Sequence, residues 1–358
     1  MYDENTSSTS PTPPVPALFP DHEEVVTVWR RRSGLHCAIA IHSTVRGPSL
    51  GGSRFRAYPS LDAAVAEVCD LAEAMTYKAA VAGLPFGGGK SVLIGDPSVI
   101  KTSELLADYA EVLNYLDGRY ITAEDVGATM ADMDELKEHT KFVAGTSVDR
   151  GGSGDPSPMT AIGILSGMEA TSAKLWGTRD LGGRHIAISG LGKVGSELAR
   201  LLIERSCTLT VADVSAAAID RVARMGPVQI VSPDVIHRTE CDIFAPCALG
   251  GALNRSSITE LRCVGVVGAA NNQLASPDIA DELNRIGILY VPDFVVNAGG
   301  IINIAHEYLG YDEKAARTHV EGIYETTRSI LDRAEEHGIT PLAAAMSIAR
   351  ERLASPDV

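Results

Sequence analysis

A glycine-rich turn at residues 190–195 constrains the fold of this chain more than any other feature. The turn reads GLGKVG and directly follows an apolar-rich segment, residues 184–189. Leucines at helical spacing follow over residues 196–205, and a second apolar run, residues 208–212, ends at Asp213. A strand, a glycine turn, a helix, a second strand and an acid in this order are typical of a dinucleotide-binding unit. The pattern therefore predicts a Rossmann-type parallel sheet.

Each position of this turn has a physical role in the prediction. Gly190 permits the tight turn, Gly192 lets the backbone approach a pyrophosphate, and Gly195 lets the helix pack close to the strand. The helix N-terminus adds N–H donors and positive potential for the phosphates. Asp213 would accept hydrogen bonds from ribose hydroxyls and repel a 2′-phosphate, which favours NAD over NADP. A chance glycine-rich turn is the alternative, and the complete strand and helix context argues against it.

The rest of the chain predicts two α/β domains separated by a cleft. We expect a disordered lead-in over residues 1–16, a substrate domain over 17–150 and an NAD domain over 151–334, with C-terminal helices (about 335–358) packing back. Periodicity predicts strands at 24–30, 35–42, 51–57, 91–94, 120–123, 228–230, 241–244, 263–268 and 288–291. It predicts helices from Leu61 with Ser60 as N-cap, around 105–116, and at 156–177, 313–336 and 341–353.

The composition is typical of a metabolic enzyme in solution. The 358 residues suffice for two domains with separate cores. No apolar run approaches the roughly 18 residues that span a bilayer, and the N-terminus does not resemble a signal peptide, so we expect a cytoplasmic protein without membrane partners. The net charge of −15 argues against nucleic acid. Six cysteines without a CxxC pair predict free thiols, and nine histidines without an HExxH pattern predict no metal site.

Two lysines and one acid of the N-terminal half are candidates for the chemistry. Lys78 ends a predicted helix, Lys90 follows three glycines (87–89), and Asp125 follows a predicted strand. Three successive glycines make sense where the backbone passes close to a ligand, and an ordinary flexible turn is an equal alternative.

One of these lysines would bind the carboxylate of an anionic, amine-bearing substrate. The other would act as a base, with its pKa lowered by burial and by its like-charged neighbour. Spacing alone also permits both lysines to be solvated surface charges.

Eight segments resemble, in order, the amino-acid dehydrogenases that act on leucine, valine and phenylalanine. They are GPSLGGSRF (47–55), AMTYKAAVAGLPFGGGKSVLIGDP (74–97), YITAEDVGATMADMD (120–134), GGSGDPSPMTAIG (151–163), GLGKVG (190–195), FAPCALGGALN (244–254), GAANNQL (268–274) and PDFVVNAGGIIN (292–303). The resemblance runs from about residue 24 to the C-terminus. It implies reversible oxidative deamination of an L-amino acid to its 2-oxo acid and ammonia, with NAD as hydride acceptor, in a homo-oligomer.

The resemblance also implies roles for single residues. Lys90 matches the catalytic lysine, Lys78 the lysine that holds the substrate carboxylate, and Asp125 the acid that handles protons on the amino group. The substrate positions that it implies, besides Lys78, are Leu50, Gly51, Met75, Ala123, Asn271, Ile301 and Ile304. The cofactor positions are Gly190, Leu191, Gly192, Lys193, Val194, Gly195, Asp213, Cys247, Ala248 and Asn271. One departure is His306, where many relatives carry aspartate.

The apolar substrate positions predict an uncharged substrate side chain. Leucine and valine enzymes often carry valine where this chain has Ile301 and Ile304, so the extra methylenes would shrink the pocket, each worth about 1–3 kcal/mol of discrimination. This favours valine, then isoleucine and leucine, with phenylalanine as the alternative. Ordinary core packing of the two isoleucines is an equal interpretation.

Two other functions remain as alternatives. A catalytically silent NAD-binding protein would bind NADH without turning over an amino acid, and intact Lys78, Lys90 and Asp125 argue against it. A hydroxy-acid dehydrogenase usually needs a paired histidine and acid, which neither His42 nor His185 supplies in the sequence.

Overall fold

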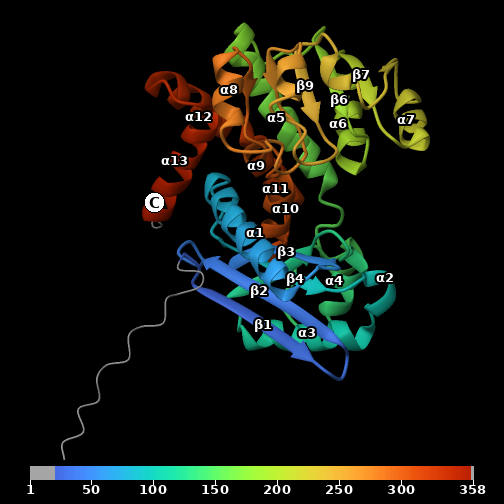
Figure 1. Ribbon diagram of the computed structural model, residues 1–358, viewed down its shortest axis with the longest axis vertical. Coiled ribbons are helices and arrows are strands. Elements are labelled where there is room, and N and C mark those ends of the chain that lie inside the picture. The colour runs from blue at the N-terminus through green and yellow to red at the C-terminus, as the bar shows by residue number, and fades with distance from the viewer. Residues whose placement is uncertain (1–20, 356–358) are drawn as a thin grey trace, which may run out of the picture.

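The computed structural model describes residues 21–355, so the expected lead-in over residues 1–16 lies outside the described part of the chain. Two sheets form in the two halves of the chain, one above the other in Figure 1. The predicted two-domain α/β fold with a Rossmann-type sheet is confirmed. Among residues 21–355, no helix has both the length and the apolar character needed to span a membrane.

The first sheet combines antiparallel and parallel strands in the order β1-β2-β4-β3-β5. Its strands are β1 (Glu24–Arg30), β2 (Leu35–Ser43), β3 (Ser49–Arg56), β4 (Gly87–Ile94) and β5 (Tyr120–Glu124). The helices of this half are α1 (Leu61–Val81), α2 (Pro97–Ile100), α3 (Ser103–Tyr115) and α4 (Met130–Leu136). The β1-β2 and β2-β4 pairs are antiparallel, whereas β3 runs parallel to both β4 and β5. The carboxyl ends of β3, β4 and β5 therefore lie at the same edge of the sheet.

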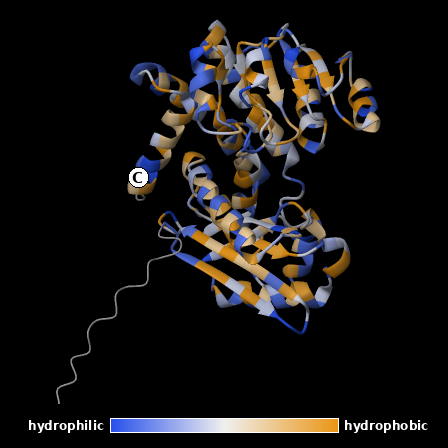
Figure 2. Cartoon of the chain, in the orientation of Figure 1, coloured by the Kyte–Doolittle hydropathy of each residue, from blue (hydrophilic) through white to orange (hydrophobic). Residues whose placement is uncertain are grey.

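Strand β2 is buried on both faces because helices cover both sides of the sheet. Cys37 and Ile39 pack in a cluster with residues of α3, whereas Ala38 and Ala40 pack in a second cluster with residues of α1. The strand is therefore apolar at successive positions, and the strands of both sheets are largely orange in Figure 2. Burial of these two layers holds β4, which carries Lys90, in a fixed place.

The second sheet is wholly parallel, in the order β11-β10-β9-β6-β7-β8. Its strands are β6 (His185–Ser189), β7 (Thr208–Ala212), β8 (Gln229–Ile230), β9 (Ile243–Pro246), β10 (Gly265–Val266) and β11 (Leu289–Tyr290). The helices of this half are α5 (Ser157–Trp176), α6 (Lys193–Glu204), α7 (Ala216–Ala223), α8 (Ile279–Arg285), α9 (Asp293–Val296), α10 (Gly299–Gly310), α11 (Glu313–Glu321), α12 (Ile323–His337) and α13 (Pro341–Ala354). Short 3-10 helices occupy Val148–Arg150, Ile236–Arg238 and Ser257–Glu260.

The expected single helix over 313–336 is wrong, because Gly322 separates α11 from α12. Its N–H donates to the carbonyls of both Thr318 and His319, so it ends one helix and begins the next. Helix α13 then packs against the end of α1, where Arg352 donates to the carbonyls of Ala80 and Val81.

Glu307 in α10 holds the segment that connects the two halves. Its carboxylate accepts hydrogen bonds from the backbone N–H groups of Gly145, Thr146 and Ser153 and from two of their hydroxyls, at 2.7–3.1 Å. Its neighbour His306 lies 3.1 Å (Nε2) from Nδ1 of His319 in α11. His306, which stands where many relatives carry aspartate, therefore links α10 to α11 beside this connecting segment.

Candidate functional site

The three glycines before Lys90 belong to strand β4 and do not form a flexible turn. A Cβ on Gly87 would lie 1.8 Å from the carbonyl oxygen of Ser43, and one on Gly88 would lie 2.1 Å from the backbone nitrogen of Thr76. The flexible turn considered from the sequence is thus wrong, whereas the close approach of this backbone to a ligand stays a prediction. The missing side chains let α1 and the end of β2 close directly onto β4, and this packing fixes the strand position from which Lys90 extends.

Lys90, in the middle of β4, and Asp125, directly after the end of β5, form an ion pair. Lys90 Nζ lies 2.7 Å from Asp125 Oδ2, and the lysine side chain is only 8% exposed. Asp125 lies close to β3 because Gly52 has no side chain. A Cβ on Gly52 would lie 2.9 Å from the Asp125 Cβ. Gly127, with φ +80°, lies so close to β3 that a Cβ would meet the Phe55 carbonyl oxygen at 1.9 Å. The fold thus brings together two residues that are far apart in sequence.

Lys78 approaches the same site from the last turn of α1. Its Nζ donates to Asn297 Oδ1 at 2.6 Å, and the Asn297 amide donates in turn to Asn271 Oδ1 at 2.8 Å. Burial lowers the pKa of Lys78 to about 8, with Asp293 opposing the shift and Lys90 adding to it. Lys78 therefore changes charge near neutral pH, which an exposed lysine would not do.

Asp125 carries a negative charge in this setting. Burial disfavours its ionised form, but the positive charges of Lys90 and Arg54 outweigh burial and hold its pKa below the ordinary value. The site therefore presents a carboxylate beside a cation, a pair that exchanges a proton over a single hydrogen bond.

These residues line one open cleft between the two halves. The substrate positions that the resemblance implied all line it: Leu50, Gly51, Met75, Lys78, Ala123, Asn271, Ile301 and Ile304, together with Lys90 and Asp125. Ile301 and Ile304 are 7% and 8% exposed and contribute to the core as well as to the cleft wall. Pocket lining and core packing, the two interpretations of these isoleucines, are therefore both correct.

Several cleft residues were missed by the sequence reasoning. They are Gly52, Arg54, Leu71, Ala74, Glu124, Pro156, Ser157, Thr160, Ala269, Asn272, Asp293, Phe294, Asn297 and Gly300. Asn297 lay within a quoted motif, PDFVVNAGGIIN, so the motif offered a signal. Arg54 likewise lay in GPSLGGSRF, but no spacing rule connects it with an acid 71 positions away.

The glycine turn of the second half has the features of a dinucleotide site. Gly192 begins α6, and nothing lies within 4 Å of a Cβ built on it, so space remains for a ligand. A Cβ on Gly195 would lie 2.0 Å from the Gly190 carbonyl, which explains the close packing of helix and strand. Gly190 has φ +101° and lies against Ala248. A pyrophosphate fits this cradle because the open position coincides with the N–H groups of a helix N-terminus.

The other expected cofactor positions surround this turn. Asp213 accepts hydrogen bonds from the backbone N–H groups of Leu191 and Ser215, which fix its carboxylate at the end of β7. Leu191 is fully buried, so only its backbone can reach a ligand. Cys247 lies next to Gly195, and Val194 extends into the cleft. The turn and the catalytic candidates thus adjoin a single space.

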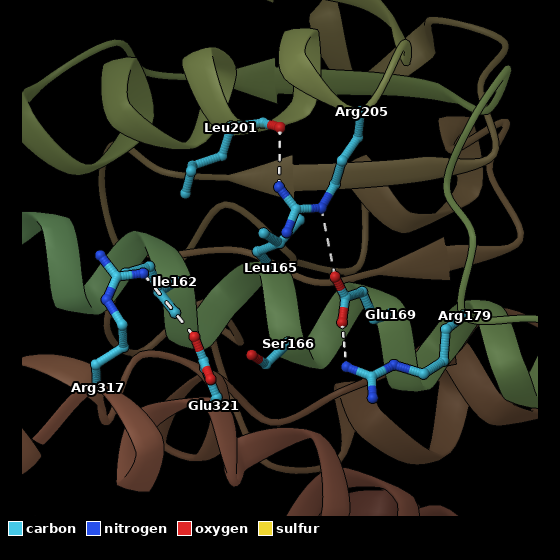
Figure 3. A pocket seen from close by; sticks show the side chains of 9 residues that line it. All are labelled: Ile162, Leu165, Ser166, Glu169, Arg179, Leu201, Arg205, Arg317 and Glu321. Atoms are coloured by element: carbon cyan, nitrogen blue, oxygen red, sulfur yellow. Dashed lines mark hydrogen bonds and ion pairs between the residues drawn. The ribbon is translucent and has the colours of Figure 1, made fainter. Parts of the chain in front are cut away.

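The cofactor role expected for Lys193 stays a prediction, and a polar hollow lies apart from the cleft. Lys193, whose side chain is 72% exposed, pairs with Asp155 at 3.0 Å. A separate hollow between α5, α6 and α11 contains three arginines (Figure 3). Arg179 and Arg205 both contact Glu169, and Arg317 faces Glu321, so two carboxylates offset part of the charge of the three arginines.

Metal and thiol chemistry receive no support from the described residues. Within residues 21–355, no three His, Cys, Asp or Glu side chains form a group that could hold a metal ion. All six cysteines are free, and burial raises the pKa of the Cys247 thiol to about 12.

Comparison with known proteins identifies the family to which this arrangement belongs. Residues 22–142 match the sequence model described as "Glu/Leu/Phe/Val dehydrogenase, dimerisation domain", and residues 215–356 match "Glutamate/Leucine/Phenylalanine/Valine dehydrogenase". The chain belongs to the Glu/Leu/Phe/Val dehydrogenase family. The resemblance inferred from the sequence motifs is therefore confirmed.

Individual members of the Glu/Leu/Phe/Val dehydrogenase family match nearly the whole chain. The valine dehydrogenase of Streptomyces virginiae is 45% identical over 335 residues, covering 93% of this chain and 94% of that protein. The leucine dehydrogenase of Bacillus subtilis is 43% identical, covering 93% and 92%. The crystal structure of L-tryptophan dehydrogenase from Nostoc punctiforme superposes with a TM-score of 0.83 at 38% identity, covering 94% and 97%.

Proposed function

We propose that this protein catalyses the reversible, NAD-dependent oxidative deamination of branched-chain L-amino acids. The observation that carries the proposal is the Lys90–Asp125 pair in the same cleft as buried Lys78. Identity above 40% to dehydrogenases of valine and leucine supports the substrate class. The cleft walls that Leu50, Met75, Ala123, Ile301 and Ile304 form are apolar, which suits an uncharged side chain.

In the proposed reaction the side chains bind the amino acid and move its protons. Lys78 in its charged form binds the substrate carboxylate as a point charge. The 190–195 turn would hold the pyrophosphate of NAD and Asp213 its ribose hydroxyls, and the cofactor would supply the hydride acceptor. Lys90 in its neutral form takes a proton from the water that attacks Cα of the resulting iminium. Asp125, as a carboxylate, takes a proton from the ammonium group of the substrate before hydride transfer and returns it to the nitrogen of the carbinolamine. The regenerated carboxylate then accepts the hydroxyl proton, so that ammonia leaves and the 2-oxo acid forms.

NAD is favoured over NADP because of the charge at the end of β7. The Asp213 carboxylate would repel a 2′-phosphate, and it is held in place by two backbone N–H groups. Comparing kcat/KM for the two cofactors tests this choice. A higher value with NADP would contradict it.

We further propose a cytoplasmic enzyme that assembles from copies of itself. The description of residues 22–142 as a dimerisation domain supports self-association. Light scattering of the purified chain checks this, and a monomer at micromolar concentration would contradict it.

The decisive experiment measures NADH formation with a panel of L-amino acids. We expect activity with valine, isoleucine and leucine, in that order, and weaker activity with phenylalanine. Isoleucine at positions 301 and 304 carries one methylene more than valine, and each methylene changes discrimination by about 1–3 kcal/mol. Replacing both by valine should therefore move preference toward leucine. NADH binding without turnover of any amino acid would instead indicate a silent NAD-binding protein.

A further inference from the structure

We propose that Arg54 is a positioning residue that serves as the permanent counter-ion of Asp125, so that Lys90 can lose its proton while Asp125 stays ionised. This inference rests on the proposed function, because it concerns the same proton transfers. It assigns a role to a side chain that carries no part of the mechanism described above.

Geometry places two cations on one oxygen of Asp125. Oδ2 lies 2.7 Å from Lys90 Nζ and 3.2 Å from Arg54 Nε. The Arg54 side chain is only 22% exposed, and that of Asp125 is 19% exposed, so water screens the contact weakly. Both cations therefore stabilise the same negative charge.

Arg54 is itself held in place by a second carboxylate. Its NH1 donates to Glu67 Oε1 of α1 at 2.6 Å, and the other oxygen of Glu67 accepts from Arg56. Arg54 thus bridges α1 and the end of β5, with one edge of its guanidinium toward each acid. A planar guanidinium can hold two carboxylates at fixed angles, whereas an ammonium group cannot.

The two cations differ in what they can do during a reaction. A lysine that acts as a base must exist without its proton, and at that moment it no longer stabilises Asp125. With no second cation, the proton released by Lys90 would move onto Asp125, and the pair would become two neutral groups. An arginine stays charged at every working pH. Arg54 therefore keeps Asp125 able to accept a proton while Lys90 is neutral.

The remaining charged groups around Asp125 do not replace Arg54. Glu124, the neighbour of Asp125 on β5, carries a negative charge and therefore disfavours the ionised form of Asp125. The groups that face Asp125 from the packed elements are Lys90 of β4, Arg54 of β3, Lys78 of α1 and, through Arg54, Glu67 of α1. Lys78 is held by Asn297, and its burial favours the neutral form, so it supplies positive charge only below about pH 8.

The test is the pH profile of kcat/KM for oxidation of L-valine by the full-length enzyme. Removing a positive charge beside Asp125 raises the pH at which its carboxylate takes up a proton. We therefore expect the acid limb of Arg54→Gln to move upward by about 1 pH unit, because an opposite charge at this range shifts a carboxyl group by about 1–3 units.

Two further variants separate charge from packing. Arg54→Lys keeps the positive charge, so its acid limb should lie near that of the wild type while kcat falls. Arg56→Gln removes another arginine from the same Glu67, but Arg56 does not touch Asp125, so its limb should not move. Equal melting temperatures and NADH affinities of the variants would show that each is folded.

The inference would be overturned if the acid limb of Arg54→Gln did not move. It would also be overturned if Arg54→Lys or Arg56→Gln moved the acid limb as far as Arg54→Gln does. These results differ from a failure of the proposed function, in which the wild-type enzyme itself would oxidise no amino acid.

Discussion

Two clusters of glycines, one in each half of the chain, have opposite purposes. In β4 the space left by Gly87 and Gly88 is filled by backbone atoms of Ser43 and Thr76. At the second turn, the space beside Gly192 stays open. Glycine therefore serves internal packing in the first cluster and suits the approach of a ligand in the second. A glycine-rich sequence alone does not distinguish the two uses, because both begin from the absence of a side chain.

Each cluster has its own lysine, and the two lysines differ in exposure. Lys90 follows the first cluster, and Lys193 lies within the second. Lys90 is 8% exposed and paired with a carboxylate at the cleft, whereas Lys193 is 72% exposed and paired with Asp155. Close packing around the first glycines thus leaves its lysine fixed and shielded, which suits chemistry. The open turn leaves its lysine at the surface.

The largest expected effect is the loss of turnover in Lys90→Ala. General acid–base help contributes about 10²–10⁴-fold, so kcat for oxidation of L-valine should fall by that factor. NADH affinity should change little, since Lys90 lies in the other half of the protein. Steady-state kinetics and NADH fluorescence titration measure the two quantities. Lys174→Ala is the matched control, because Lys174 pairs with Asp332 and Glu335 outside the cleft. An equally large loss of kcat in that variant would contradict the comparison.

The next largest effect is a loss of stability in Gly88→Ala. The added Cβ would lie 2.1 Å from the Thr76 backbone nitrogen, and backbone atoms cannot rotate away from it. Overpacking of this kind should lower the free energy of unfolding by about 3 kcal/mol. Urea denaturation followed by circular dichroism measures the change. If stability were unchanged, the packing role of the β4 glycines would be wrong.

A pH dependence of substrate binding should follow from buried Lys78. Its pKa is lowered to about 8, so the charged form decreases as the pH rises above 8. Affinity of the NADH complex for a branched-chain 2-oxo acid should then weaken by up to about tenfold per pH unit. Stability should change in the opposite sense. The unfolded lysine keeps its proton up to its ordinary pKa of about 10.4. Lys78 therefore increases the free energy of unfolding as the pH rises from about 8 toward that value.

Isothermal titration between pH 7 and pH 9.5 checks the predicted loss of affinity. Lys78→Arg supplies the control, because an arginine keeps its charge over the whole range. Equal pH dependence in both proteins would show that another group is responsible.

The smallest effect completes the contrast between the glycine clusters. Gly192→Ala should change the free energy of unfolding by less than about 1 kcal/mol, because open space surrounds the new methyl group. That space is the proposed site of the pyrophosphate, so NADH affinity should fall by about tenfold, equivalent to 1.4 kcal/mol. Thermal melting and NADH titration measure the pair. A large loss of stability with unchanged affinity would reverse the assignment of this turn.

Local requirements explain which parts of the fold were predictable from the sequence. The unit from His185 to Asp213 is contiguous, and each element leaves a short-range signal, such as the glycine with φ +101° at position 190. Ser60 likewise caps α1 as predicted, accepting a hydrogen bond from the Ala63 N–H. The packing of the triple glycine could not be predicted locally, because its environment comes from β2 and α1, which no local pattern specifies.

The sequence by itself determined the dinucleotide-binding unit, the α/β class and, through resemblance, the family of this protein. Only the tertiary structure decided which charges meet. Asn297 reaches Lys78 across 219 positions, and Arg54 reaches Asp125 across 71. The physical reason is that turns and helices depend on the conformation of neighbouring residues, whereas ion pairs depend on the order of strands in a sheet. Here β3 lies between β4 and β5, and this order brings Arg54, Lys90 and Asp125 together.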